Sequence, residues 1–311
     1  MPKTDDSSLG PEDRRFVENR AKRLLDRADA WGRFPTQIDD IMEAAELKVT
    51  AASGLFDPAA IVAYLLQKGT QATSTVKTAL SKILGLYDGH EKTVHIDGTV
   101  VAAKQTFLKL HEAGHHELPT HRKIFRFFQD CEKTLRPDIA DQFEREANNF
   151  ARYALFQGDT FGNIAADFNL EIKSVTKLAR KFGASVYASA REYARTNRRA
   201  CMVYVLEPLV YTPGEGYQAP VRRIEASPSF AFRFGVPTDE SISGKHPLGK
   251  LLPIGRKMTK PTTFEVLDRN GEKQEVIGEA FDTGFNVLIL IYAVSELPGS
   301  VVRSNLIISA G

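Results

Sequence analysis

The residues best suited to chemistry are the five of His111-Glu112-Ala113-Gly114-His115, an HExxH motif. Four residues make about one helical turn, so both imidazoles lie on one face and can bind a single zinc ion at about 2.0–2.1 Å. Glu112 can take a proton from a zinc-bound water and later deliver it to the amine leaving group. HExxH also occurs by chance, and four of the seven histidines lie between residues 111 and 121, so a solvated histidine-rich face is the alternative.

A third protein ligand is needed, and a downstream helical acid is the natural candidate. Glu144 and Glu146 flank the apolar stripe of one predicted helix on opposite sides, so periodicity alone does not choose between them. We favour Glu144, because Asn148 lies one turn later on its face and can orient the carboxylate. Glu146 stays open as the alternative ligand, and an exposed acid paired with a neighbouring arginine is the structural alternative for either.

Two further histidines, His116 and His121, lack the spacing of ligands to this metal. We expect both to be exposed and assign them no role.

Helices and strands must position these residues. Residues 101–115 and 136–157 show helical periodicity, the latter with an apolar stripe from Phe143 to Ala154. The strand predicted at Thr93–Ile96 precedes the HExxH helix, and an edge strand in that place can align an extended peptide over the metal. Upstream, we predict helices at 16–28, 38–45, 58–67 and 73–86, a short strand at 47–49 and a loop at 87–91.

The chain changes character near residue 200. Two shorter helices meet at residues 182–184 with Ser185 as the cap of the second, which predicts a helix-turn-helix. Turn-rich stretches at 211–220 and 237–247 are expected to be exposed loops. Short β-rich runs predict strands at 202–206, 263–267, 273–277, 286–294 and 305–309.

Length, composition and charge limit the classes of protein to which this chain can belong. A chain of 311 residues, 42% hydrophobic and 26% charged, has the composition of a globular protein and the length of about two domains. A net charge of +2 gives no global signal for polyanion binding, and the two cysteines lie too far apart for a disulfide framework. The longest apolar run, residues 287–294, is shorter than the roughly 20 residues that cross a bilayer. Because the N-terminus also lacks the features of a secretory signal, we expect a cytoplasmic protein with no membrane partner.

The segments LKLHEAGHHELP and FEREANNFARYAL resemble the ImmA/IrrE family of bacterial zinc metallopeptidases, in which these blocks form the HExxH helix and the ligand-bearing helix. The resemblance covers about residues 15–210 and is strongest at the metal motif. It implies His111, His115 and Glu144 as zinc ligands, Glu112 as general base and Asn148 in a supporting contact. Nitrogen and oxygen ligands fit zinc without excluding manganese.

The predicted fold class is α+β in three parts: a mainly helical, zincin-like peptidase domain at 1–158, a helix-turn-helix connector at 159–200 and a β-rich domain at 201–311. In its position the last part is similar to the GAF-like sensory domain of the family. The resemblance implies a zinc-dependent endopeptidase whose protein substrate is a helix-turn-helix transcriptional repressor. Cleaving it would release stress-response or mobile-element genes.

Two other functions stay open. Residues 173–199 carry eight basic residues, which makes phosphate contact and direct DNA binding physically possible, although a helical hairpin with solvated lysines explains them at least as well. The leading alternative is therefore a DNA-binding transcriptional regulator with a structural or vestigial metal site. The other is a ligand sensor whose terminal domain, residues 201–311, controls association.

Overall fold

The computed structural model describes residues 6–51, 85–88, 92–96, 99–121, 137–214 and 216–296. It divides into two compact units, one formed by residues 1–160 with 181–184 and the other by residues 161–180 with 185–311. Helices and strands are mixed along the chain, in agreement with the predicted α+β class. The division into three functional domains and the GAF-like identity stay predictions.

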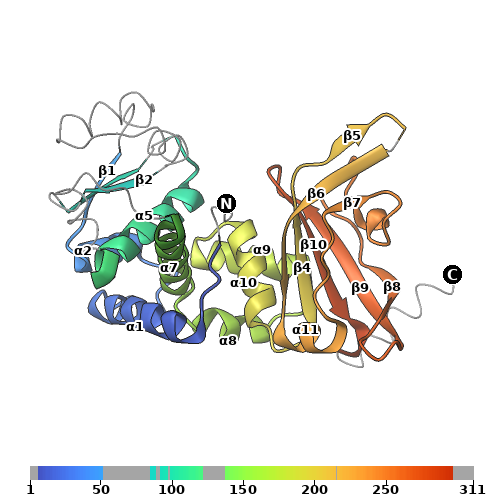
Figure 1. Cartoon of the computed structure of the whole chain (residues 1–311), viewed down its shortest axis with the longest axis horizontal. Helices are drawn as coiled ribbons and strands as arrows, with labels where there is room; N and C mark the ends of the chain where they lie inside the picture. The colour runs from blue at the N-terminus through green and yellow to red at the C-terminus, as the bar shows by residue number, and fades with distance from the viewer. Residues whose placement is uncertain are drawn as a thin grey trace. The chain divides into compact units, whose positions relative to one another are not determined.

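The described residues of the first unit form four helices and a three-stranded sheet (Figure 1). Strand β3 lies at the centre of this sheet, parallel to β1 and antiparallel to β2. The elements are α1 (Pro11–Arg27), α2 (Ile38–Ala44), β1 (Lys48–Ala51), β2 (Gly85–Asp88), β3 (Thr93–Ile96), α5 (Ala102–Glu117) and α7 (Pro137–Phe156).

Helices α5 and α7 pack closely together, and a glycine permits the approach. A Cβ atom added to Gly114 would lie only 3.1 Å from Cβ of Phe150 and 3.3 Å from Cα of Ala147. The predicted apolar stripe of α7 is buried throughout, from Phe143 to Ala154. The HExxH helix and the helix that bears Glu144 are thus held at close range by side-chain size and by burial of apolar surface.

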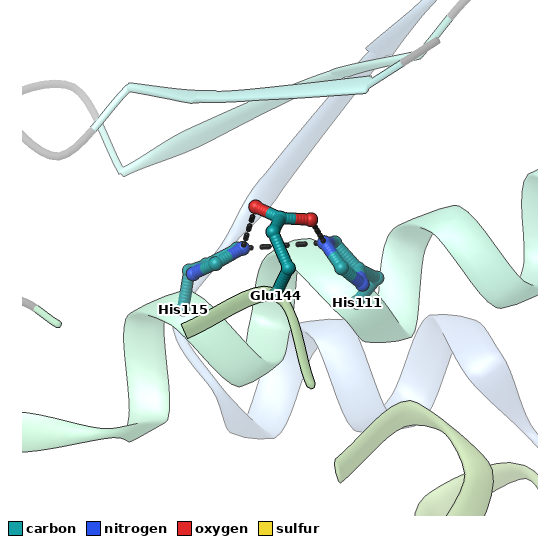
Figure 2. A group of neighbouring side chains, drawn as sticks. All are labelled: His111, His115 and Glu144. Carbon is teal, nitrogen blue, oxygen red and sulfur yellow. Dashed lines mark hydrogen bonds and ion pairs between the residues drawn. The ribbon is translucent and has the colours of Figure 1, made fainter. Parts of the chain in front are cut away.

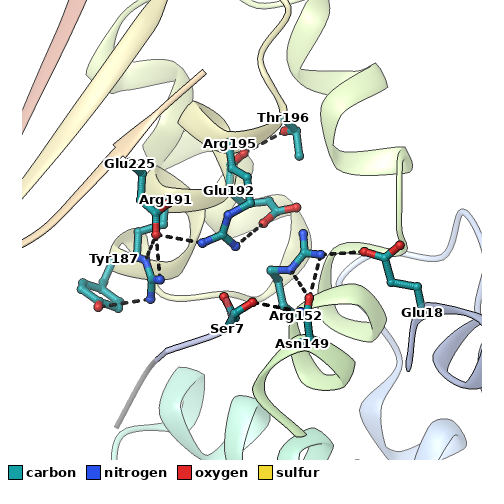
Figure 3. Close-up of polar contacts among 10 residues, drawn as sticks. All are labelled: Ser7, Glu18, Asn149, Arg152, Tyr187, Arg191, Glu192, Arg195, Thr196 and Glu225. Atoms are coloured by element: carbon teal, nitrogen blue, oxygen red, sulfur yellow. Dashed lines mark hydrogen bonds and ion pairs between the residues drawn. The ribbon is translucent and has the colours of Figure 1, made fainter. Parts of the chain in front are cut away.

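Helix α1 covers another side of α7 and adds polar contacts to it. Arg152 of α7 forms an ion pair of 2.9 Å with Glu18 of α1 and donates to the side-chain oxygen of Asn149 (Figure 3). The amide of Asn149 donates in turn to the carbonyl oxygen of Ser7. These contacts bind α7 to the N-terminal part of the same unit.

Several local predictions in this unit are confirmed and others are wrong. The helices at 102–117 and 137–156 and the strands at 48–51 and 93–96 lie where periodicity placed them, within a few residues. Residues 85–88 form β2, so the predicted helix at 73–86 is wrong at its end and the loop at 87–91 is wrong at its start. The predicted helix at 58–67 lies outside the described residues.

The predicted edge position of residues 93–96 is also wrong. The register pairs Val94 with Val49 of β1 on one side and with Tyr87 of β2 on the other. A strand with partners on both sides has no free hydrogen-bonding edge for a peptide.

The second unit begins with the helices α8 (Thr160–Ala166), α9 (Ile172–Phe182) and α10 (Val186–Thr196). A curled antiparallel sheet follows, in the order β5-β6-β4-β10-β9-β8 with β7 beside β6 (Figure 1). Ser185 caps α10 as predicted, since its side chain accepts from the amide of Ala188 at 3.1 Å. The later elements are β4 (Cys201–Leu206), β5 (Val210–Thr212), β6 (Gly216–Ala226), α11 (Pro228–Phe234), β7 (Ser241–Ser243), β8 (Thr262–Leu267), β9 (Lys273–Asp282) and β10 (Val287–Ala293), with short 3₁₀ turns at Gly249–Leu251 and Val294–Glu296.

Strands β4 and β10 are buried on both faces. Met202, Tyr204 and Leu206 point into an apolar core that also takes in Phe230 of α11, while helix α10 packs against β4 and β6. The expected loop at 211–220 is wrong, because β5 and β6 form a hairpin with Gly214 in its turn, in which Tyr211 pairs with Tyr217. The expected loop at 237–247 is wrong in part, because residues 241–243 form β7. Helix α11 was not predicted, and the strand predicted at 305–309 lies outside the described residues.

No helix among the described residues combines the length and the apolar character needed to span a membrane.

Candidate metal centre

Three of the predicted site residues meet between α5 and α7 (Figure 2). The Nε2 atoms of His111 and His115, one turn apart on α5, lie 3.2 Å from each other. The carboxylate of Glu144 reaches over from α7, with one oxygen 3.3 Å from Nε2 of His111 and the other 3.6 Å from Nε2 of His115. Three ligand atoms of two chemical types therefore surround one point.

These separations fit a tetrahedral metal ion. Ligands held at about 2.0–2.1 Å from a zinc ion lie about 3.3–3.4 Å from one another along the edges of a tetrahedron. The two nitrogens lie 3.2 Å apart, and each lies 3.3 or 3.6 Å from a carboxylate oxygen of Glu144, a different oxygen for each histidine, so the separations are close to that value. Two imidazoles and one carboxylate are also the donor set of catalytic zinc sites that leave the fourth position open. The geometry favours Glu144 over Glu146 as the third ligand.

Burial differs among the three residues in a way that suits an open site. The side chains of His111 and His115 are 12% and 6% exposed, whereas Glu144 is 57% exposed. The two imidazoles are held in the interior, and the carboxylate closes the group from the solvent side.

Without a metal, the three residues form an ion pair. Burial by itself would lower the pKa of His111, but hydrogen bonding to Glu144 and the negative charges of Glu144 and Glu112 raise it to about 9. Burial would raise the pKa of Glu144, yet the contact with His111 lowers it to about 2. His115, buried beside the charged His111, has a pKa well below its ordinary value and stays neutral. A metal ion that bound here would have to displace the proton of His111, because only the neutral imidazole has a lone pair to offer.

Asn148 supports His111 and not Glu144. Its side-chain oxygen lies 3.0 Å from Nδ1 of His111, and its amide donates to the carbonyl oxygen of Asp6 at 2.8 Å. The expectation that it orients the Glu144 carboxylate is therefore wrong. Asn148 lies one turn further along α7 than Glu144, and it meets the histidine one turn earlier on α5.

The predictions of exposure for His116 and His121 are also wrong, since their exposed fractions are 7% and 0%. Nδ1 of His121 lies 3.0 Å from Nδ1 of His115, and its Nε2 lies 2.9 Å from a carboxylate oxygen of Glu146. The carboxylate of Glu146 is thus in hydrogen-bonding contact with His121. The signal that sequence reasoning missed is Pro119, which breaks the helix and lets the chain turn back toward His115.

Glu112 follows His111 on α5 and is 8% exposed. Its charge contributes to the raised pKa of His111, so its carboxylate lies within electrostatic range of the metal-ligand group. A buried carboxylate in this place has the surroundings that a proton-transferring group needs.

The basic residues of the helix-turn-helix belong to two different environments. Arg191 and Arg195 of α10 both pair with Glu225 of β6, at 2.7 and 2.8 Å, so they are used within the second unit (Figure 3). Residues 189–194 of α10 are buried, so this helix cannot enter a DNA groove by that face. The exposed basic residues are Lys173, Lys177, Arg180 and Lys181 of α9 and Arg198, which follows α10.

Comparison with known proteins supports the sequence resemblance. Residues 74–192 match the family model of the IrrE N-terminal-like peptidase domain, a span that contains the HExxH motif and Glu144. A solved structure described as a transcriptional regulator of Mycobacterium tuberculosis is similar to this chain, with a TM-score of 0.51 and 12% identity over 90% of this chain and 76% of the other. At that identity the likeness shows the fold alone. No curated protein matches the chain.

Proposed function

We propose that this chain, which carries an IrrE N-terminal-like peptidase domain, is a zinc-dependent endopeptidase. The observation that carries the proposal is the convergence of two imidazole nitrogens and one carboxylate at the spacing of a tetrahedral site. His111, His115 and Glu144 would hold the metal. When bound, the metal supplies Lewis-acid polarisation of the scissile carbonyl and lowers the pKa of the attacking water.

Glu112 would move the proton. It takes a proton from the attacking water as the oxygen adds to the carbonyl carbon, and it passes that proton to the amine nitrogen as the peptide bond breaks. Its burial beside His111 keeps competing solvent away from this transfer. Asn148, which contacts Nδ1 of His111, keeps the Nε2 atom of that histidine turned toward Glu144.

Strand β2 is the better candidate for aligning a substrate. It pairs with β3 along one side, and among the described residues no strand pairs with its other side. Helix α5 packs against both β2 and β3. An extended peptide that added to the free side of β2 would lie beside the HExxH helix with its main chain hydrogen-bonded, which is how peptides bind at sheet edges.

The substrate that we propose is a helix-turn-helix transcriptional repressor, whose cleavage releases stress-response or mobile-element genes. The family match supports it, because the resemblance to the ImmA/IrrE family implies a substrate of this class.

One experiment tests the whole proposal. The metal content of the purified protein and the cleavage of a co-expressed candidate repressor are compared for wild type, Glu112→Gln and Glu144→Ala. Glu117→Gln, which changes an acid on the same helix that pairs with Arg27, is the matched control. We expect about one metal ion and cleavage in wild type and control, metal without cleavage in Glu112→Gln, and loss of metal in Glu144→Ala. A wild-type protein that binds no metal would refute the proposal.

A second candidate function is DNA binding, favoured by the exposed basic residues Lys173, Lys177 and Arg180 on α9. They recur at three- and four-residue intervals and so share one helical face. Duplex binding that weakens steeply with salt and survives Glu112→Gln would support this function, because phosphate contacts release counterions and need no metal.

A further inference from the structure

His121 is enclosed between the metal-ligand group and an acid on α7. It is completely buried, and its ring stacks on Phe143 with centroids 4.0 Å apart and planes at 21°. One ring nitrogen faces His115 at 3.0 Å and the other faces Glu146 at 2.9 Å. Gln142, one turn earlier on α7, donates to the second oxygen of Glu146 at 2.8 Å. Four side chains thus form a continuous chain of contacts that ends on His115.

When both imidazoles are neutral, one assignment of hydrogens satisfies every contact in this series of side chains. Two Nδ1 atoms face each other, so one must donate and the other must accept. If His115 carries its proton on Nδ1, it donates to His121, whose own proton then lies on Nε2 and is donated to Glu146. The same assignment leaves Nε2 of His115 with a lone pair, and that is the nitrogen next to His111 and Glu144.

The opposite assignment interrupts this series of hydrogen bonds. A proton on Nε2 of His115 would occupy the position of a metal ligand atom. Donation from Nδ1 of neutral His121 would then leave only a lone pair on its Nε2, facing the carboxylate of Glu146 across 2.9 Å. Two acceptors at that distance repel each other, so the carboxylate selects the tautomer of His121 and, through it, that of His115.

We propose that His121 and Glu146 are positioning residues that fix the tautomer and the ring orientation of His115, so that its Nε2 lone pair faces the metal. The inference rests on the proposed metal site and deepens it. It assigns Glu146 a role other than that of a ligand, and it gives the two ligand histidines different supports: a neutral amide for His111 and a carboxylate-linked imidazole for His115.

The test compares Zn²⁺ affinity, measured by chelator competition, for full-length wild type, His121→Phe and His121→Asn. Phenylalanine keeps the stacking on Phe143 but has no acceptor, whereas asparagine fills the space poorly but carries an acceptor oxygen near the position of Nδ1. We expect His121→Phe to weaken Zn²⁺ binding by about 10- to 100-fold and His121→Asn to weaken it less. A purely structural role predicts the reverse order, because the aromatic ring fills the buried space better.

Substitutions of Glu146 give an independent measurement. Glu146→Gln keeps an oxygen that accepts from His121, so it should retain more affinity than Glu146→Leu does. Glu18→Gln, which changes a partly buried acid paired with Arg152 in the same unit, is the matched control and should bind like wild type.

The outcomes separate this inference from the proposed function. If wild type binds no Zn²⁺, both fail together. If wild type binds Zn²⁺ but His121→Phe binds equally well, or binds better than His121→Asn, the positioning role is overturned and the metal site stands. Equal affinities of Glu146→Gln and Glu146→Leu would also overturn it.

Discussion

Substituting Gly114 by alanine should separate metal binding from folding, because this glycine sets the distance between α5 and α7. The added Cβ would lie 3.1 and 3.2 Å from Cβ and Cγ of Phe150 and 3.3 Å from Cα of Ala147. Carbon atoms rest about 3.5–4.0 Å apart, so α7 must move away by a few tenths of an ångström. Glu144 lies on α7 one turn from Ala147, and its carboxylate moves with the helix.

The loss of Zn²⁺ affinity depends on how far a ligand can move before it no longer fits the metal site. Ligand distances in zinc sites vary by about 0.2 Å, which is less than the expected movement of α7. We therefore expect Zn²⁺ affinity to fall about tenfold, or about 1.4 kcal/mol. The unfolding free energy should fall by about 0–2 kcal/mol, because alanine favours a helix over glycine by about 1 kcal/mol and this partly offsets packing strain of about 1–3 kcal/mol.

Chelator competition and chemical denaturation of Gly114→Ala measure the two effects. Gly162→Ala is the matched control: its Cβ would lie 3.2 Å from Cβ of Thr196 in the second unit, away from the ligands. It should show comparable strain with unchanged Zn²⁺ affinity. A Gly114→Ala protein that folds and binds Zn²⁺ like wild type would refute the reasoning that the helix approach places Glu144.

Three further predictions concern charge. The ion pair of Glu144 and His111 should contribute most to the stability of the metal-free protein between about pH 4.5 and 6.5: this contribution falls at lower pH toward the pKa of about 2 of Glu144 and at higher pH through the pKa of about 9 of His111. Unfolding curves of Glu144→Gln should lack this dependence, which is worth about 1–3 kcal/mol after screening of the half-exposed carboxylate. Glu225→Ala should cost about 2–3 kcal/mol in denaturant unfolding, because two arginines lose their partner; a loss below 0.5, roughly the value of an exposed pair, would contradict this. Burial raises the pKa of Glu279 to about 6, so its ionisation lowers stability as pH rises from 4.5 through 6; Glu279→Gln should be about 1–2 kcal/mol more stable than wild type at pH 7.5 and equal to it near pH 4.5.

The ligand-bearing helices could be predicted because their signals are local. The spacing of His111 and His115 determines their common face on any helix, and the apolar stripe of residues 143–154 determines which side of α7 is buried. The choice between Glu144 and Glu146 depends on the angle at which α5 and α7 meet. That angle is set by Gly114 against Ala147 and Phe150, a contact between residues more than 30 positions apart.

The supporting contacts could not be predicted for the same reason. His121 reaches His115 only after the chain turns at Leu118, whose extended conformation before Pro119 ends the helix. The glycines of residues 211–220 dominate the local pattern and predict a loop, whereas the pairing of β6 with the separate strands β4 and β7 is not visible in that pattern. Short edge elements depend on such partners more than on their own residues.

A count of the basic residues in the helix-turn-helix does not show which of them form ion pairs with acids elsewhere in the protein. Arg191 and Arg195 are held by Glu225, an acid about 30 residues later on a strand, and that pairing buries the helix that would otherwise read a groove. Within the second unit, α10 therefore acts as a packing element for the sheet. Any contact of this region with phosphate would come from its exposed basic residues, which are Lys173, Lys177, Arg180 and Lys181 of α9 and Arg198. Such a contact would be electrostatic and independent of DNA sequence.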